Sequence, residues 1–172
     1  MDELTHLDHA AQLGTLQQAL NDKGAASQLF EPNERLPVTT LMIDVGPDDT
    51  GRDRVLAASI MPLADDGLDD TQLVQFYAQM PFAIDDESLA SVQRAVPIVN
   101  AALAIGHFGM QNGELFYRYV LAMPNGATFD LAMTVEIVAL MAFHQEHFGD
   151  FFEGIVDDEI TLSTLPDLLA AG

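Results

Sequence analysis

The sequence predicts an α+β fold in which an antiparallel sheet of about five strands carries helices packed on one of its faces. Asn112-Gly113 joins two alternating segments, which is typical of a tight β-hairpin. Earlier segments also alternate between apolar and polar residues, whereas other segments repeat apolar residues every three or four positions. The predicted order of elements is therefore helix, three strands, helix, two strands and helix.

The first predicted helix covers residues 3–22, where leucines and alanines recur at spacings of three and four. Gly24 is a suitable stop, because glycine accepts the backbone conformation that ends many helices. Residues 25–37 are irregular and contain two prolines, and within them Ser27–Phe30 has the composition of a short edge strand.

Three strands are predicted next, at residues 38–45, 55–63 and 73–82, because apolar residues recur at every second position. The acidic segment 46–54, GPDDTGRDR, is expected to be the hairpin loop between the first two of these strands. A strand with this period has one apolar side and one mixed side, so the block should present one core face and one outward face.

The second helix is predicted to begin at Asp85 or Asp86, since aspartate is a favoured helix cap. Pro97 lies inside the helical pattern and cannot donate a backbone hydrogen bond, so we expect a kink or a break near it. The apolar positions that define the pattern are Leu89, Val92, Val96, Val99 and Leu103.

The hairpin that follows has a fixed register, because a two-residue turn determines which residues face each other. Its outward face is mostly polar, and Phe116 is expected to lie over the bare backbone of Gly109. The predicted pairs are Gly106 with Tyr119, Phe108 with Tyr117 and Met110 with Leu115 on the apolar face, and His107 with Arg118, Gly109 with Phe116 and Gln111 with Glu114 on the other.

The last predicted helix begins after Thr128 or Asp130 and runs to about His147. Its apolar residues cover nearly the whole circumference, so the sheet can cover one side while the first helix or a second subunit covers the other. We expect a homodimer in which this helix supplies the contact, through Met133, Ile137, Leu140 and Met141. Residues 1–150 are interpreted as one domain, and residues 151–172 as an acidic tail with a short helix near Leu165–Leu169.

The composition of the chain excludes several classes of function. Among 172 residues, 27 are Asp or Glu and 6 are Lys or Arg, giving a formal net charge of -21. Such a surface repels nucleic acid and anionic membranes and attracts a basic protein or peptide segment. An equally simple interpretation is that the charge serves only solubility or a salty habitat. The absence of cysteine excludes disulfides and thiolate chemistry. The acidic N-terminus and the lack of a long apolar run predict a cytoplasmic protein.

Three segments carry a family resemblance: FYAQMPF at 76–82, VNAALAIGHFGM at 99–110 and GELFYRYVLAMPNG at 113–126. With the predicted order of elements, they resemble the YbjN-like family, which is classed with bacterial sensory transduction regulators. In that family an Asn-containing helix runs into a Leu-Gly or Ile-Gly junction, then a small residue, an aromatic residue and a hairpin. Ile105-Gly106 and Phe108 match these places.

The resemblance spans roughly residues 35–150 and depends on structural motifs, so it bears on fold more than on function. It implies a fold like that of type III secretion chaperones, and a small, acidic, dimeric protein that handles other proteins. It brings no catalytic residues to this chain. The acidic loop at 46–54 and the segment after Gly149 fall outside it.

Two patterns suggest metal binding, each with a simpler alternative. His144 and His147 lie at i and i+3 near a helix end, as do His6 and His9, and with a carboxylate either pair could hold a metal ion. Histidines near a helix C-terminus are also favoured by the helix dipole alone. The Asp clusters at 48–53 and 65–70 lack the pattern of a calcium loop and are better explained as solvated turns.

Common enzyme signatures are missing from the sequence. The chain has no GxSxG elbow and no GxGxxG motif, and its sole lysine, Lys23, lies in no phosphate-binding loop. We therefore expect neither catalysis nor a cofactor. The sequence leaves one enzymatic alternative open, a metal-dependent enzyme that uses His144 and His147.

The remaining candidate is a surface on the outward face of the sheet, formed by Val38, Met42, Met61, Tyr77 and Phe116. Methionine and aromatic side chains suit an adaptable protein-binding surface, although scattered surface apolar residues are an equally simple interpretation. The sequence thus favours a non-enzymatic regulatory or chaperone-like adaptor that binds a protein partner. A dedicated type III secretion chaperone for an effector is the nearest alternative.

Overall fold

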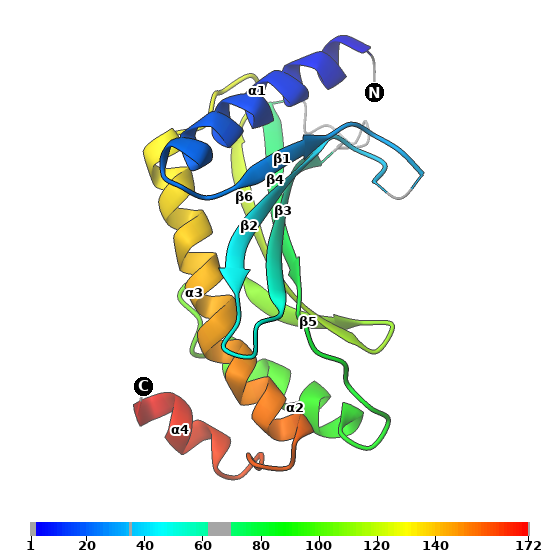
Figure 1. The fold of residues 1–172 in the computed structure, drawn as a ribbon, viewed down its shortest axis with the longest axis vertical. Helices are drawn as coiled ribbons and strands as arrows, with labels where there is room; N and C mark the ends of the chain where they lie inside the picture. The colour runs from blue at the N-terminus through cyan, green and yellow to red at the C-terminus, as the bar shows by residue number, and fades with distance from the viewer. Residues whose placement is uncertain (1–2, 35, 62–69, 172) are drawn as a thin grey trace.

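The computed structural model describes residues 3–34, 36–61 and 70–171, and for residues 3–6 it describes the backbone only. The described residues form ten helices and strands (Figure 1). They are α1 (Glu3–Asp22), β1 (Ser27–Phe30), β2 (Thr40–Pro47), β3 (Asp53–Met61), β4 (Thr71–Gln79), α2 (Leu89–Asn100), β5 (His107–Gln111), β6 (Glu114–Pro124), α3 (Leu131–Val156) and α4 (Leu165–Ala171).

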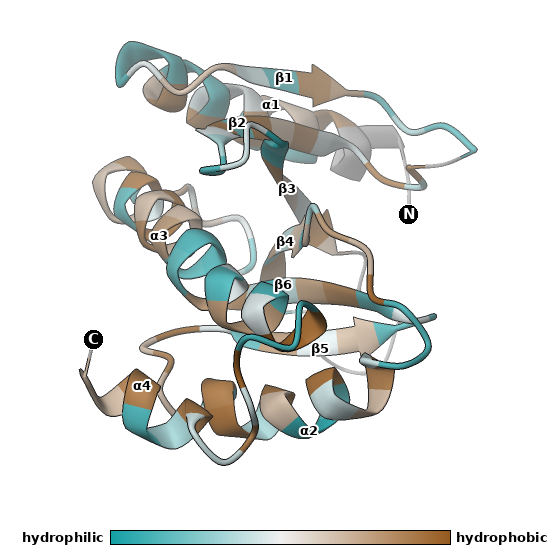
Figure 2. Cartoon of the chain, turned by 60° about the horizontal axis from the view of Figure 1, so that its bottom comes forward, coloured by the Kyte–Doolittle hydropathy of each residue, from teal (hydrophilic) through white to brown (hydrophobic). Residues whose placement is uncertain are grey.

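The strands form one antiparallel sheet in the order β1-β2-β3-β4-β6-β5 (Figure 2). The predicted α+β class with an antiparallel sheet is confirmed. The described sheet has six strands rather than five, because Ser27–Phe30 pairs with β2 as an edge strand. Helices α1 and α3 lie along one side of the sheet, while α2 packs against β5 and α3, and α4 packs against α2.

The hairpin of β5 and β6 has the predicted register. Asn112 and Gly113 both have positive φ, 53° and 84°, as a type I′ turn requires. Five of the six predicted pairs are present, from His107 with Arg118 to Gln111 with Glu114. Gly106 precedes β5 and is not paired, but the backbone oxygen of Arg118 and the ring of Tyr117 leave no room for a side chain there.

One core lies between the sheet and the helices, and it draws on α1, all the central strands, α2, α3 and α4. Asn100 ties the end of α2 to β5, because its side chain exchanges two hydrogen bonds with the backbone of Phe108. The largest fully buried side chains include Tyr117, Phe76, Phe108 and Phe152. The core therefore concentrates aromatic area where α3 crosses the hairpin.

Helix α3 begins as predicted after Asp130, whose carboxylate accepts a hydrogen bond from the backbone N–H of Met133. The predicted end near His147 is wrong, since α3 continues to Val156. Two glycines inside the helix permit close packing. A Cβ at Gly149 would lie 2.6 Å from Met80 Cε, and one at Gly154 would lie 2.8 Å from Ile160 Cδ1.

Other boundaries shift by a few residues. The strand predicted at 73–82 ends at Gln79, and the helix predicted to reach Leu103 ends at Asn100, one turn after Pro97. Ser88 rather than an aspartate is the N-cap of α2, and Asp85 instead accepts hydrogen bonds from the backbone N–H and the hydroxyl of Ser88. The short helix predicted near 165–169 is α4. Within the described ranges, no helix is both long enough and apolar enough to cross a membrane.

Candidate functional site

The outward face of the sheet, opposite the core, is the candidate site. Strand alternation places Leu41, Leu56, Phe76 and Tyr117 in the core and their sequence neighbours on the outward face. One row of paired residues crosses five strands on this face: Met42, Ala57, Tyr77, Arg118 and His107. Helices α1 and α3 cover the other face (Figure 1), so this row faces away from them.

An aromatic pair lies on the outward face where β4 meets β6. The rings of Tyr77 and Phe116 stack at 5.4 Å between centroids, and His107 meets Phe116 edge-on at 6.2 Å. Phe116 lies over Gly109, as predicted, and a side chain at Gly109 would collide with its ring. Burial and the nearby Glu114 carboxylate both raise the pKa of Tyr77, so its phenol is neutral at physiological pH.

A groove of about 760 Å³ opens beside this aromatic pair. Its walls are the start of β3, residues 79–89 and the hairpin turn at 112–114. Its apolar lining residues include Val55 and Phe82, and its acidic lining residues are Asp53, Asp86 and Glu114. None of the described residues lining the groove is basic. The groove can therefore receive an apolar group that carries or adjoins a positive charge.

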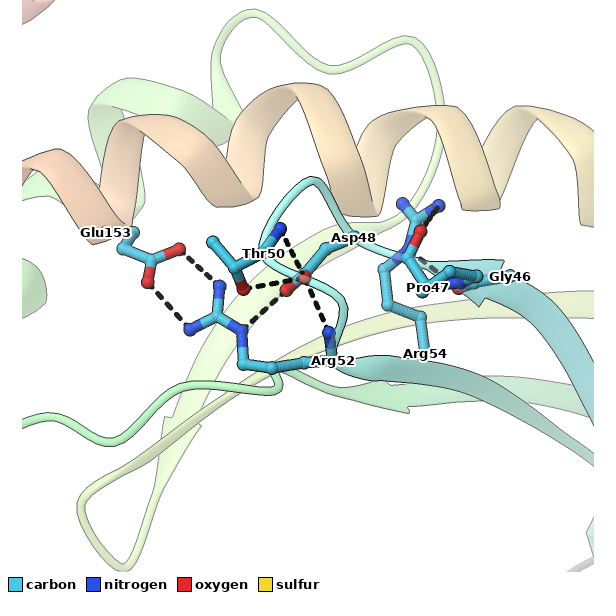
Figure 3. Close-up of polar contacts among 7 residues, drawn as sticks. All are labelled: Gly46, Pro47, Asp48, Thr50, Arg52, Arg54 and Glu153. Carbon is cyan, nitrogen blue, oxygen red and sulfur yellow. Dashed lines mark hydrogen bonds and ion pairs between the residues drawn. The ribbon is translucent and has the colours of Figure 1, made fainter.

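The loop between β2 and β3 is fastened to α3 beside this groove (Figure 3). Arg52 donates two hydrogen bonds to Glu153, at 2.7 and 2.6 Å, and a third from Nε to Asp48. Its guanidinium also lies 5.9 Å from the ring centroid of Phe82, in the groove wall. Burial opposes ionisation of Asp48, but hydrogen bonds from Arg52 and Thr50 hold its pKa well below the usual range.

Arg54 lies on the core side of β3 and is buried against the same helix. It donates to Glu146 and to the backbone oxygen of Ala142. The predicted view of 46–54 as a solvated hairpin loop is therefore incomplete, because two of the chain's few basic residues anchor this region to α3. The only available signal was the occurrence of two arginines in an otherwise acidic segment.

The five predicted patch residues are all half-buried. Tyr77 and Phe116 contact each other, and Met61 accepts a hydrogen bond at Sδ from Arg118 at 3.8 Å. Met42 lies in the same row as Tyr77, separated from it by Ala57, whereas Val38 precedes β2 and is not part of a strand. Sequence reasoning omitted Arg118 and the groove from this surface.

The predicted dimer contact divides into two groups. Met133 is 47% exposed, and Ile137 and Leu140 are half-buried, so these three side chains are accessible on α3. Met141 is fully buried in the core of the single chain, so its assignment to a contact surface is wrong. A helix with apolar residues on all sides does not reveal which side faces the sheet. Phe143, which was not predicted, is 56% exposed.

His144 is a buried core residue. Tyr117 Oη lies 2.7 Å from the backbone oxygen of Ile105 and 2.7 Å from His144 Nδ1. Because the carbonyl can only accept, the phenol donates to Ile105 and accepts from a protonated Nδ1. Burial, and secondarily the neighbouring His147, lower the pKa of His144, which is therefore neutral at physiological pH.

The metal hypothesis gains no geometric support from this pair. His147 stacks on Phe143 at 5.3 Å between centroids, and Nδ1 of His144 is already engaged by Tyr117. In the part of the chain that the structure describes, no three His, Asp or Glu side chains are placed to hold a metal ion. The side chain of His6 and most of the Asp cluster at 65–70 lie outside the described residues.

Comparisons with known proteins give a likeness in structure but none in sequence. No protein-family model matches the chain, and no curated protein sequence matches it. Among solved structures, the chain is similar to the crystal structure of YbjN, "a putative transcription regulator from E. coli", with 16% sequence identity and a TM-score of 0.40. The match covers 84% of this chain and 89% of YbjN. At this distance it does not bear on function.

Proposed function

We propose that this chain is a non-enzymatic adaptor, regulatory or chaperone-like, that holds a segment of a protein partner on the outward face of its sheet. The observation that supports this most directly is the stacked pair of Tyr77 and Phe116 on a face turned away from α1 and α3. Aromatic residues with one polar tip are enriched at protein interfaces because they bury large areas at low entropic cost.

The neighbouring groove gives the partner segment a chemical character. Its apolar lining suits an aliphatic or aromatic side chain, and its three carboxylates suit a lysine or arginine close to that side chain. The net charge of -21 would steer a basic segment toward the protein. We expect the partner segment to combine an apolar anchor with a basic residue.

A peptide-display selection tests the proposed site. Random linear peptides are selected against the purified protein and then tested for binding to a variant that carries Tyr77→Ala and Phe116→Ala. Peptides with apolar and basic residues should bind the unaltered protein and lose binding to the double variant. Leu7→Ala is the matched control, because Leu7 is an exposed apolar residue on α1, away from the sheet's outward face and from the proposed dimer contact.

Two results would contradict the proposal. One is that no peptide is enriched over a blank surface. The other is that the enriched peptides bind the double variant as tightly as the unaltered protein. Circular dichroism and urea unfolding of each variant show whether a loss of binding reflects a loss of fold.

A homodimer through α3 forms the second part of the proposal. Met133 and Phe143, exposed by 47% and 56%, lie on α3 with the half-buried Ile137 and Leu140 between them in sequence. An exposed apolar stripe of this kind commonly marks an association surface. Light scattering should give the mass of two chains at micromolar concentration, and Phe143→Glu with Met133→Glu should give the mass of one. A single-chain mass for the unaltered protein would contradict the dimer.

A further inference from the structure

Arg118 differs from Arg52 and Arg54 in the hydrogen-bond partners of its guanidinium. Its Nη2 donates to Met61 Sδ at 3.8 Å, a weak acceptor, and its Nε is buried without a hydrogen-bond partner. Arg52 and Arg54, by contrast, both pair with carboxylates of α3. Among the described residues no salt bridge involves Arg118, although the chain carries 27 acidic residues against 6 basic ones.

A buried Nε–H without an acceptor is costly, and the weak sulfur acceptor of Nη2 compensates little. Removing an N–H group from water without a replacement acceptor costs about 1–3 kcal/mol. A carboxylate is the acceptor that best matches the planar donors of arginine. Arg118 faces the outward side of the sheet, opposite Tyr77 on β4, so an acceptor can reach it only from that side.

We infer that Arg118 binds an acidic side chain, Asp or Glu, of the segment held on the outward face; this inference rests on the proposed function. The positions of Arg118 and Glu114 determine the order of acidic and basic residues along that segment. Arg118 and Glu114 are four residues apart on β6, which corresponds to about 13 Å along a strand. The acidic side chain lies over Arg118, and the basic one lies toward Glu114 and the groove.

This order of charges also explains how an acidic side chain can bind Arg118 on a protein that is itself strongly acidic. A wholly acidic partner would be repelled by the net charge of -21, whereas a segment of mixed or basic charge can place one carboxylate on Arg118. Arg118 therefore acts as a specificity-determining residue that fixes the direction of the segment along β6. The aromatic pair of Tyr77 and Phe116, next to it, supplies apolar contact area.

Small aromatic probes test this assignment without a known partner. The probes are 3-phenylpropionate and its neutral amide, 3-phenylpropanamide, added to ¹⁵N-labelled protein. The readout is the Nε–H NMR signal of Arg118, assigned by its loss in Arg118→Gln. The acid should shift this signal with an apparent Kd about tenfold lower than that of the amide, which corresponds to about 1.4 kcal/mol. In Arg118→Gln, saturation-transfer measurements should show acid and amide binding equally.

The same measurements separate this inference from the proposed function. Equal shifts by acid and amide in the unaltered protein, or no shift by either, would overturn the role of Arg118. Phe116→Ala should weaken both probes by a similar factor while preserving the preference for the acid. If Phe116→Ala leaves both affinities unchanged and the preference for the acid persists, the aromatic patch is refuted while the carboxylate site at Arg118 is retained.

Discussion

Phe116 and Tyr117 are neighbours on strand β6, and their side chains lie on opposite faces of the sheet. Tyr117 is fully buried and stacks on Phe108 at 4.7 Å, where Phe152 of α3 also contacts Phe108. Phe116 is half-buried and stacks on Tyr77 at 5.4 Å on the outward face. Tyr117 with Phe108 (the inner pair) and Phe116 with Tyr77 (the outer pair) are both stacked aromatic rings. They differ in that the core covers only the inner pair. The inner pair stabilises the fold, and the outer pair keeps part of its ring surface exposed.

The largest expected effect is on the inner pair. Phe108→Ala should lower the free energy of unfolding by about 3–5 kcal/mol, because it leaves a cavity between the hairpin and α3. Urea unfolding followed by circular dichroism measures this change. Leu7→Ala, which truncates an exposed side chain on α1, is the control and should change stability little. A loss of less than about 1 kcal/mol for Phe108→Ala would remove the energetic distinction between the two faces.

A smaller effect is expected from the hydroxyl of the inner pair. Tyr117→Phe keeps the ring but leaves the Ile105 carbonyl and the Nδ1–H of His144 unpaired in the core, which should cost about 1–3 kcal/mol. Tyr119→Phe is the matched control on the same strand. No described residue forms a hydrogen bond with the Tyr119 hydroxyl, so its removal should be nearly neutral. Equal losses in the two variants would show that the Tyr117 contacts contribute little.

The buried His144 makes the inner face sensitive to acid. In the unfolded chain its pKa is near 6.5, and in the folded chain burial lowers that pKa, so below about pH 6.5 the unfolded chain binds more protons. Stability should therefore fall between about pH 7.5 and pH 5.5, by no more than about 1.4 kcal/mol, as the unfolded state gains this proton. Urea unfolding at several pH values measures the slope.

His144→Asn is the control for this pH effect, because an asparagine amide can still donate near the Nδ1 position but does not titrate. Its stability should be lower overall but depend less on pH in this range. Asp150, whose pKa is raised by burial and by nearby Asp49, contributes to both proteins and cancels in their difference. Parallel slopes for the two proteins would exclude His144 as the titrating group.

The faces of the two pairs could be predicted from the sequence because the turn at Asn112-Gly113 fixes the register locally. Once that turn is recognised, alternation assigns Tyr117 to the core and Phe116 to the outside without further information. The place of Phe116 over Gly109 follows from the same register. Local signals therefore predicted five of the six described strands, whereas Ser27–Phe30, although its composition suits an edge strand, was left out of the predicted order.

Contacts between distant segments could not be predicted in this way. Arg52 and Glu153 are 101 positions apart, and Tyr117 and His144 are 27 apart, so no local pattern links them. The histidines therefore suggested a metal pair, although His144 instead completes a core hydrogen bond. The length of α3 was underestimated because Gly149 usually signals a helix end, and its packing against Met80 depends on the tertiary fold.

The smallest effect on stability, and the largest on binding, is expected from Phe116→Ala. The ring contacts Tyr77 and the backbone of Gly109 but remains half-exposed, so its loss should cost about 1 kcal/mol or less. Urea unfolding compares this value directly with that of Phe108→Ala, and selected peptides measure binding in the same preparations. A cost near that of Phe108→Ala would mean that the outer pair is also part of the core, and the distinction between a stabilising face and a binding face would fail.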